Sequence, residues 1–298
     1  MFSAKILCDS LSPAGVRLTT IEVTMPRIIL AEFNTHRMFS RNSASSRAIP
    51  VEKRISMVEI DPFIPAQFVK NIKGMQALET ITDSDAIEAR DVWIKSLQSS
   101  IISARSLAKL GVHKQLANRL IEPFCWHTVI CTATEWDNFW GLRRHKDAQP
   151  EIRKAAELMH EAYVMSSPKA IAYDDWHLPL IEEGEEFDLE VQGFDVRKVS
   201  AGRCARVSYL THDGKRDPQA DVDLSDRLVQ SGHMSPLEHV ARPLDIGDME
   251  WILQKPGIVG VDRQDFDSRE VFCANFRGWK QLRKTLPYES NFLERPVT

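Results

Sequence analysis

The chain has 298 residues, of which 43% are hydrophobic and 27% charged, and its net charge is −4. A globular chain of this length can bury a full core without disulfides or a structural metal. The acidic balance argues against a general nucleic-acid coat, which would be basic overall. Five scattered cysteines without a C-x-x-C pair favour a reducing compartment, and no apolar run is long enough to cross a bilayer. We therefore expect a cytoplasmic protein that binds neither membranes nor nucleic acid and holds no metal.

The apolar patterns predict more helix than strand, in agreement with only 13 glycines in the chain. Thr134 and Asp137 resemble a capping box at the start of one helix. The predicted elements are, in chain order, a strand at 17–24, a helix after Pro26 that continues to Phe33, a long helix from Asp83 or Ser84 to Leu110, a buried strand at 126–133, a helix through Leu142 and a helix that begins at Pro150.

The last third of the chain predicts a linker, a helix and a docked tail. Residues 179–190 carry six carboxylates and read as a solvated acidic loop. Residues 221–231 read as a helix that Gly232 ends. The aromatic residues of the tail should pack against the rest of the chain; they are Phe272, Phe276, Trp279, Tyr288 and Phe292.

The densest polar cluster is SRNSASSR, residues 40–47. The guanidinium of Arg47 can bind phosphate oxygens through two parallel hydrogen bonds, and the serine hydroxyls can fill the remaining acceptor sites. Arg119 and Arg143 add separated cations, which favours a small phosphorylated ligand over a duplex. The alternatives are a solvated loop at 40–47 and a helix-capping role for Arg143.

A second polar segment is GHMSPLEH, residues 232–239. His233 and His239 could bind a metal, but no single helical face presents a spacing of six residues, and Pro236 interrupts it. A shaped turn beneath a flat ligand is the better interpretation.

Residues 35–47, THRMFSRNSASSR, resemble the signature R-H-R-x-x-S-x-N-x-x-S-x-R of the flavin-dependent thymidylate synthases, the ThyX family. The matching residues are His36, Arg37, Ser40, Asn42, Ser45 and Arg47. Further stretches are similar to the same family: NRLIEP at 118–123, NFWGLR at 138–143 with Gln149 beyond it, CARVSY at 204–209, and GHMSPLEH.

The order of these segments differs from that of the family, where the last two precede the signature. The resemblance therefore implies a circular permutation of a single ThyX-like domain that spans residues 1–298. Residues 17–167 correspond to the family's central and C-terminal part and 196–240 to its N-terminal part. Residues 168–195 form an acidic linker, and 241–298 are an extension.

The resemblance implies a helix-rich, mixed α+β fold around a central, mostly antiparallel sheet, assembled as a homotetramer with FAD and dUMP between subunits. The implied reaction transfers one carbon from methylenetetrahydrofolate to uracil C5, with NADPH as reductant. Arg143 would be the catalytic residue, because a permanent cation can stabilise negative charge on the uracil. The implied dUMP-binding residues are Ser45, Ser46, Arg47, Arg119 and Arg143. The implied FAD-binding residues are His36, Arg37, Asn138, His233, Ser235 and Glu238.

The sequence also departs from the family. Thr35 and Thr134 replace arginines, Ser43 replaces a glutamate and Glu32 a glutamine. These departures leave open a related reaction, such as hydroxymethylation or a dCMP substrate, and a non-catalytic nucleotide-binding homologue. Another alternative is a pyrimidine methylase with a cysteine nucleophile, for which Cys125 in PFCWH is the candidate.

Overall fold

The computed structural model describes residues 1–298 except 74–78, 208–215, 249–266, 288, 290 and 292–298. Its centre is a five-stranded sheet in the order β3-β4-β2-β1-β5. The strands are β1 (Ser3–Leu11), β2 (Arg17–Pro26), β3 (Ser40–Ser43), β4 (Trp126–Ala133) and β5 (Lys169–Ala170). All neighbouring pairs are antiparallel except β1 and β5. The predicted mixed fold with a mostly antiparallel sheet is confirmed.

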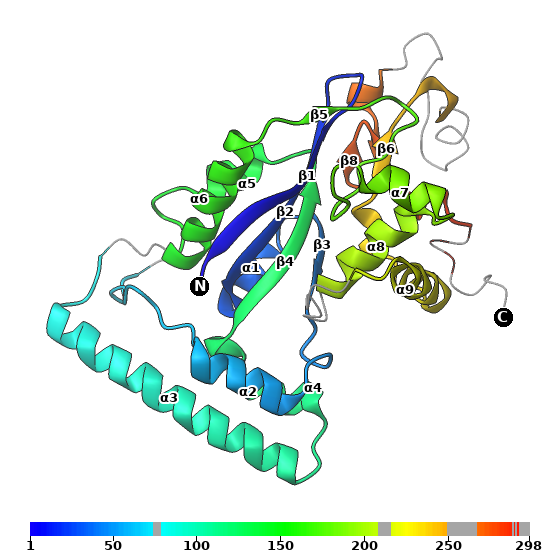
Figure 1. Ribbon diagram of the computed structural model, residues 1–298. Helices are drawn as coiled ribbons and strands as arrows, with labels where there is room; N and C mark the ends of the chain where they lie inside the picture. The colour runs from blue at the N-terminus through cyan, green and yellow to red at the C-terminus, as the bar shows by residue number, and fades with distance from the viewer. Residues whose placement is uncertain (74–78, 208–215, 249–266, 288, 290, 292–298) are drawn as a thin grey trace.

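Helices cover both faces of the sheet, and Figure 1 shows α5 and α6 on one side and α7, α8 and α9 on the other. On the first side lie η1 (Arg27–Ile29), α1 (Leu30–Phe33), α5 (Asp137–Arg143) and α6 (Pro150–Met165). On the second lie α7 (Glu185–Val191), α8 (Val196–Val207) and α9 (Pro218–Ser231). Val129 of β4 packs in the core of the first side, and Ile130 packs with Cys204 of α8. Because both of its faces are covered, β4 carries an apolar, β-branched sequence.

A third group of helices lies at one end of the sheet (Figure 1). It consists of α2 (Val51–Ile60), α3 (Asp83–Lys109), α4 (Lys114–Ala117) and the 3₁₀ segment η2 (Asn118–Phe124). Leu97 and Ile101 of α3 pack against Ile55 and Ile121. The long helix is confirmed, but its N-cap is Thr82 rather than Asp83 or Ser84: the Thr82 hydroxyl accepts from the Asp85 amide at 3.2 Å.

The tail folds back onto the sheet through short elements. These are η3 (Ser235–Glu238), β6 (Ala241–Pro243), η4 (Ile246–Asp248), η6 (Ser268–Glu270), β7 (Phe272–Cys273), β8 (Phe276–Arg277), β9 (Trp279–Gln281) and η7 (Leu282–Thr285). Strand β6 pairs with β9, and Phe276 and Trp279 are fully buried. Docking is confirmed for these two aromatics. Phe272 is exposed, and Tyr288 and Phe292 lie outside the described residues.

Two local predictions are wrong. Thr134 does not cap α5; its hydroxyl accepts a hydrogen bond from the Arg277 amide at 3.0 Å, because the tail strand β8 passes there. Residues 179–190 are not a simple solvated loop, since α7 begins within them, Leu189 is buried, and Glu185 pairs with Arg203 at 2.7 Å. Within the described residues, no helix combines the length and apolar character needed to span a membrane.

Candidate functional site

The second part of the signature segment, residues 40–47, begins as the edge strand β3 of the sheet. Residues 40–43 pair with β4, and the chain then leaves the sheet through a turn closed by a 3.0 Å hydrogen bond from the Ala48 amide to the Ser45 carbonyl. Ser45 and Arg47 are exposed on this turn, whereas Ser46 is buried. The edge position thus presents hydroxyl and guanidinium groups to an incoming ligand.

A cavity of 340 Å³ joins this turn to the segment at 233–236, nearly 200 residues later. Its lining includes Ser45, Arg47, His233 and Ser235. Ser40 also donates to a Glu238 carboxylate oxygen at 3.0 Å. With Asn42 and Ser43, which also line it, the cavity offers a guanidinium, an imidazole, an amide and three hydroxyl groups, a donor set suited to an anionic ligand.

Two hydrogen bonds fix this junction. The Asn42 side-chain amide donates to the Cys204 carbonyl of α8 at 2.8 Å. Arg283 of η7 forms an ion pair with Glu238. The tail therefore helps to hold η3 against the signature strand.

Arg143, at the end of α5, is held by the first part of the signature segment. Its Nε donates to His36 Nε2 at 2.9 Å, and its Nη2 donates to the Thr35 hydroxyl at 3.2 Å. Burial, together with the charges of Arg143 and Arg41, lowers the pKa of His36 to about 4. His36 is therefore neutral near pH 7, so its Nε2 can accept from the guanidinium.

A third cluster surrounds Glu122 in η2. Its carboxylate pairs with Arg27 at 3.0 Å and Arg119 at 3.1 Å, and it accepts from the Ser46 hydroxyl. Burial alone would raise the pKa of Glu122, but the Ser46 hydrogen bond and the Arg27 charge hold it below its usual value. Arg27 and Arg119 also line a cavity of 430 Å³. The sequence analysis did not identify Arg27, which stands alone after β2 without any motif around it.

The sequence-predicted residues thus fall into three places in one chain. Arg47, Ser45, His233 and Ser235 share one cavity, whose lining includes neither Arg119, Arg143, His36 nor Arg37. Arg37 and Asn138 are exposed. The structure brings the signature and the 233–238 segment together, and the candidate catalytic Arg143 does not line the cavity that they share.

The alternative sites from the sequence analysis have little support. No group of three or more metal-ligating side chains occurs in the part of the chain that the structure describes. Cys125 is 3% exposed, its thiol donates to the Ile121 carbonyl at 3.2 Å, and burial raises its pKa. A buried thiol with a raised pKa is a poor nucleophile.

A buried polar network, missed from the sequence, crosses the sheet beneath the site. His177 bonds Ser10 at 2.8 Å and Thr20 at 2.7 Å, Thr20 bonds Thr132, and Thr132 bonds His239 Nδ1 at 2.7 Å. Burial lowers the pKa values of His177 and His239 to about 3. Both imidazoles are neutral near pH 7, and they tie η3 to the sheet.

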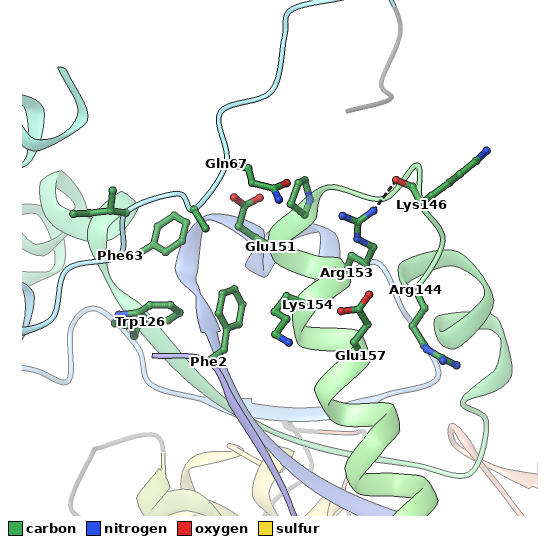
Figure 2. Close-up of a pocket in the computed structure, with 13 residues that line it drawn as sticks. Phe2, Phe63, Gln67, Trp126, Arg144, Lys146, Glu151, Arg153, Lys154 and Glu157 are labelled. Carbon is green, nitrogen blue, oxygen red and sulfur yellow. Dashed lines mark hydrogen bonds between the residues drawn. The ribbon is translucent and has the colours of Figure 1, made fainter. Parts of the chain in front are cut away.

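A larger cavity of 690 Å³ lies beside α6 (Figure 2). Figure 2 shows Phe2, Phe63 and Trp126 at one end and Arg144 and Arg153 toward the other. None of the sequence-predicted site residues lines it.

Comparison with known proteins identifies the family to which the chain belongs. The chain matches the family described as "Thymidylate synthase complementing protein" over residues 10–169, more than half of its length. Residues 196–240 lie outside that match. No curated protein matches the chain.

Two similar solved structures are those of the UMP/dUMP methylase PolB from Streptomyces cacaoi, bound with 5-Br UMP and with 5-Br dUMP. Each is 15% identical to the chain and covers 55% of it. The matches cover 89% and 90% of the PolB chains, with TM-scores of 0.47 and 0.46.

Proposed function

Because the chain belongs to the thymidylate synthase complementing protein family, we propose that it is a flavin-dependent thymidylate synthase, which transfers a one-carbon unit from methylenetetrahydrofolate to C5 of dUMP. The observation that carries this proposal is the cavity shared by Arg47, Ser45, His233 and Ser235. It brings together two separated segments, each of which resembles part of one family site.

In this proposal the phosphate of dUMP binds Arg47 and Ser45, and Arg119 and Ser46 complete the nucleotide site. Arg47 is exposed on the turn and can pair with two phosphate oxygens. Arg119 is 62% exposed in spite of its contact with Glu122, so it can also reach an anion.

Arg143 is the proposed catalytic residue. Attack from uracil C5 requires electron density on the ring, and a fixed guanidinium stabilises the negative charge that develops. Neutral His36 accepts from Nε, and the Thr35 hydroxyl accepts from Nη2, which orients the guanidinium plane. Cys125 has no part in this mechanism.

FAD would supply the redox chemistry of the one-carbon transfer when bound, with NADPH as reductant. The polar side chains at His233, Ser235, Arg37 and Asn138 suit a phosphate-bearing cofactor, and we propose that they hold it together with His36 and Glu238. Glu238 already binds Ser40 and Arg283, so we propose that it contributes to the cofactor site by positioning η3.

The tail places one cation, Arg277, near one of the departures from the family. The Arg277 backbone amide binds the hydroxyl of Thr134, and its guanidinium pairs with Glu135. We propose that Arg277 compensates for the arginine that Thr134 replaces. This is a role for the extension at 241–298 in a permuted domain.

Arg143 does not line the cavity at the phosphate-binding turn, and this supports a site shared between subunits of a homo-oligomer, a tetramer in this proposal. We also propose that the domain is circularly permuted, so that residues 196–240 supply the segments that precede the signature elsewhere in the family. The acidic segment at 168–195 would join the old ends.

The test combines colour with isotope release. Purified protein should be yellow, and with methylenetetrahydrofolate and NADPH it should release tritium from 5-tritiated dUMP. Release from 5-tritiated dCMP alone would move the substrate to cytosine, and mass spectrometry of the product separates methyl from hydroxymethyl. Binding of dUMP without any release would favour the non-catalytic homologue.

A further inference from the structure

The cavity beside α6 has no part in the proposed function. Its volume is 690 Å³, within the range of roughly 300–1,000 Å³ that is usual for small-molecule sites. None of the residues proposed to bind dUMP or FAD lines it. Its lining combines aromatic rings, a buried carboxylate and a group of cations, and each of these features restricts the chemistry of a ligand.

The cations of the lining form no ion pairs within the described part of the chain. They are Arg144, Lys146, Arg153 and Lys154. Arg144 and Lys154 are exposed, so water and ligands can reach them. Arg153 Nη1 donates to the Lys146 carbonyl at 3.0 Å, which holds the guanidinium beside the cavity while its Nε and Nη2 keep no acceptor among the described residues. Two carboxylates also line the cavity, so the four cations leave an excess of two positive charges, which suits a phosphate monoester.

Glu151 is the buried carboxylate. It is 8% exposed and accepts no hydrogen bond from the described residues, yet its oxygens are not enclosed by protein. It lies in the first turn of α6, where the positive end of the helix stabilises negative charge. A largely buried carboxylate calls for hydrogen-bond donors, so a ligand of this cavity should present N–H groups to it. The second carboxylate, Glu157, is exposed and can be solvated.

The aromatic end of the cavity offers ring surface to a flat ligand. Phe2 and Trp126 are half-buried, and Phe63 is fully buried behind them. Trp126 packs edge-on against Phe2 and Phe63, with centroid distances of 5.1 Å and 5.5 Å, so the rings are held in place. The Trp126 N–H is itself enclosed, and the residue contributes only its ring. Nucleobases stack on aromatic side chains of this kind.

We propose that this cavity binds a guanine nucleotide, separately from the proposed thymidylate synthase site. Guanine presents two adjacent N–H donors, on N1 and on the exocyclic N2, which match the two oxygens of Glu151. The base stacks against Phe2 and Trp126. Its phosphate reaches Lys154, one helical turn beyond Glu151, and the arginines toward the far end of the cavity (Figure 2).

The carboxylate of Glu151 also selects against other bases. Adenine places an acceptor at N1 beside its amino group, and uracil has a single N–H between two carbonyl oxygens. Each of these bases would direct an acceptor toward the carboxylate, which is repulsive. We therefore expect the cavity to prefer guanine to adenine and to reject dUMP.

Calorimetric titration of the full chain tests the site, with GMP as the probe and AMP as the comparison. The wild type should bind GMP, and it should bind AMP at least about tenfold more weakly, because AMP lacks the pair of donors. Saturating dUMP should leave the affinity for GMP unchanged. This binding is expected whether or not the protein makes thymidylate, so its failure and that of the proposed function are distinguishable.

Two variants assign the contacts. Glu151→Gln keeps the shape of the side chain but removes its charge, so it should bind GMP at least about tenfold more weakly and lose the preference over AMP. Its matched control is Glu161→Gln, an exposed position of α6 outside the cavity. Lys154→Met should weaken GMP and AMP alike by several-fold, and Lys95→Met on exposed surface of α3 is the control for it. Both controls should bind as the wild type does.

Several results would overturn the proposal. They are absence of GMP binding to the wild type, AMP that binds as tightly as GMP, and unchanged GMP affinity in both Glu151→Gln and Lys154→Met. Displacement of GMP by dUMP would place GMP in the nucleotide site at Arg47 instead. Folic acid that displaces GMP and binds more tightly would overturn the assignment to a nucleotide, because its pterin ring carries the same pair of N–H donors.

Discussion

Arg143 owes its orientation to the protonation state of a neighbour. If His36 were an imidazolium, its Nε2 would carry a proton and would repel the guanidinium. Burial lowers the pKa of His36 to about 4, which keeps the ring neutral and the 2.9 Å hydrogen bond intact. A cation placed in this way is oriented before substrate binds, and this preorganisation is what electrostatic catalysis requires.

Replacing Arg143 should reduce turnover more than binding. Arg143→Ala is expected to lower kcat on the order of a hundredfold or more, the scale of removing one oxyanion donor. Arg143→Lys keeps the charge but loses the planar fork, so it should also be impaired. Tritium release from 5-tritiated dUMP measures the effect, and unchanged turnover would reduce Arg143 to a helix cap.

Cys125→Ser is the control for this prediction. The thiol is buried and donates to a backbone carbonyl, so the hydroxyl can take over that bond and activity should persist. An inactive Cys125→Ser with an active Arg143→Ala would favour the cysteine-dependent alternative.

Arg47 should contribute to affinity and hardly to folding. Its side chain is exposed on the turn after β3, so Arg47→Ala removes a ligand contact and leaves the core intact. The loss of one charge-assisted contact to phosphate should weaken dUMP binding by about 1.5–3 kcal/mol, or roughly ten- to a hundredfold. Calorimetry on folded protein measures it. If Arg47→Ala bound dUMP as tightly as the wild type does, Arg47 would not be a dUMP-binding residue.

At the scale of elements, the contact of α8 with α9 depends on Gly202. A Cβ at this position would lie 2.9 Å from the Asp221 Cα and closer still to its carbonyl. Gly202→Ala should therefore force the two helices apart and lower the free energy of unfolding by at least about 2 kcal/mol. Urea denaturation measures the change.

Gly141→Ala in α5 is the matched control, because no described atom lies within 4 Å of the added Cβ. An alanine within a helix should stabilise it by about 0.5–1 kcal/mol. Similar effects from the two substitutions would contradict the close packing of α8 on α9.

Elements whose signals lie within their own sequence were predicted correctly, whereas those that depend on distant contacts were not. The long apolar repeat of α3, Pro150 at the start of α6 and the β-branched run of β4 are local signals, and the sequence predicted them. The prediction of Thr134 as an N-cap was wrong because its hydroxyl accepts a hydrogen bond from Arg277, in a tail strand 143 residues away. The prediction of a solvated loop at 179–190 was wrong for a similar reason, since Glu185 at the start of α7 pairs with Arg203 of α8.

The residues of the candidate site show the same difference between local motifs and long-range contacts. The polar turn at 45–47 and the histidine segment were visible as motifs, and their meeting in one cavity followed only from the resemblance. Arg27 and His177 carry no motif. Their importance comes from long-range pairing with Glu122 and Thr20, which no local pattern reveals.

For the whole molecule, four buried histidines should make stability depend on pH. The pKa values of His127, His177 and His239 are lowered to about 3, and that of His36 to about 4. Their pKa is about 6.5 when unfolded. Between these values the unfolded chain binds more protons, so stability is lost as pH falls below about 6.5.

Each such histidine contributes up to about 1.4 kcal/mol per pH unit in this window. In His239→Asn, the slope of unfolding free energy against pH between 6 and 4 should fall by about that amount. Urea denaturation at several pH values measures the slope. A variant slope equal to that of the wild type would mean that His239 is not held neutral in the folded protein.

If sites are shared between subunits, two different variants should complement each other in a mixed oligomer. Arg47 and Arg143 line no common cavity around the phosphate-binding turn of one chain. If a complete site takes Arg47 from one subunit and Arg143 from another, the two variants can restore each other's activity, measured at a dUMP concentration too low to saturate Arg47→Ala. The test unfolds Arg47→Ala and Arg143→Ala together in equal amounts and refolds the mixture. The two kinds of subunit then assemble at random into mixed oligomers. Half of the subunits then carry an intact Arg47 and the other half an intact Arg143, so about a quarter of the sites should contain both arginines, and tritium release should recover to about that fraction of the wild-type rate. The two variants mixed without unfolding are the control, and where subunits do not exchange the mixture should be no more active than the separate variants at that dUMP concentration. If the refolded mixture is no more active than its components, both arginines act within one chain, and the turn at 45–47 must approach α5 on binding its ligand.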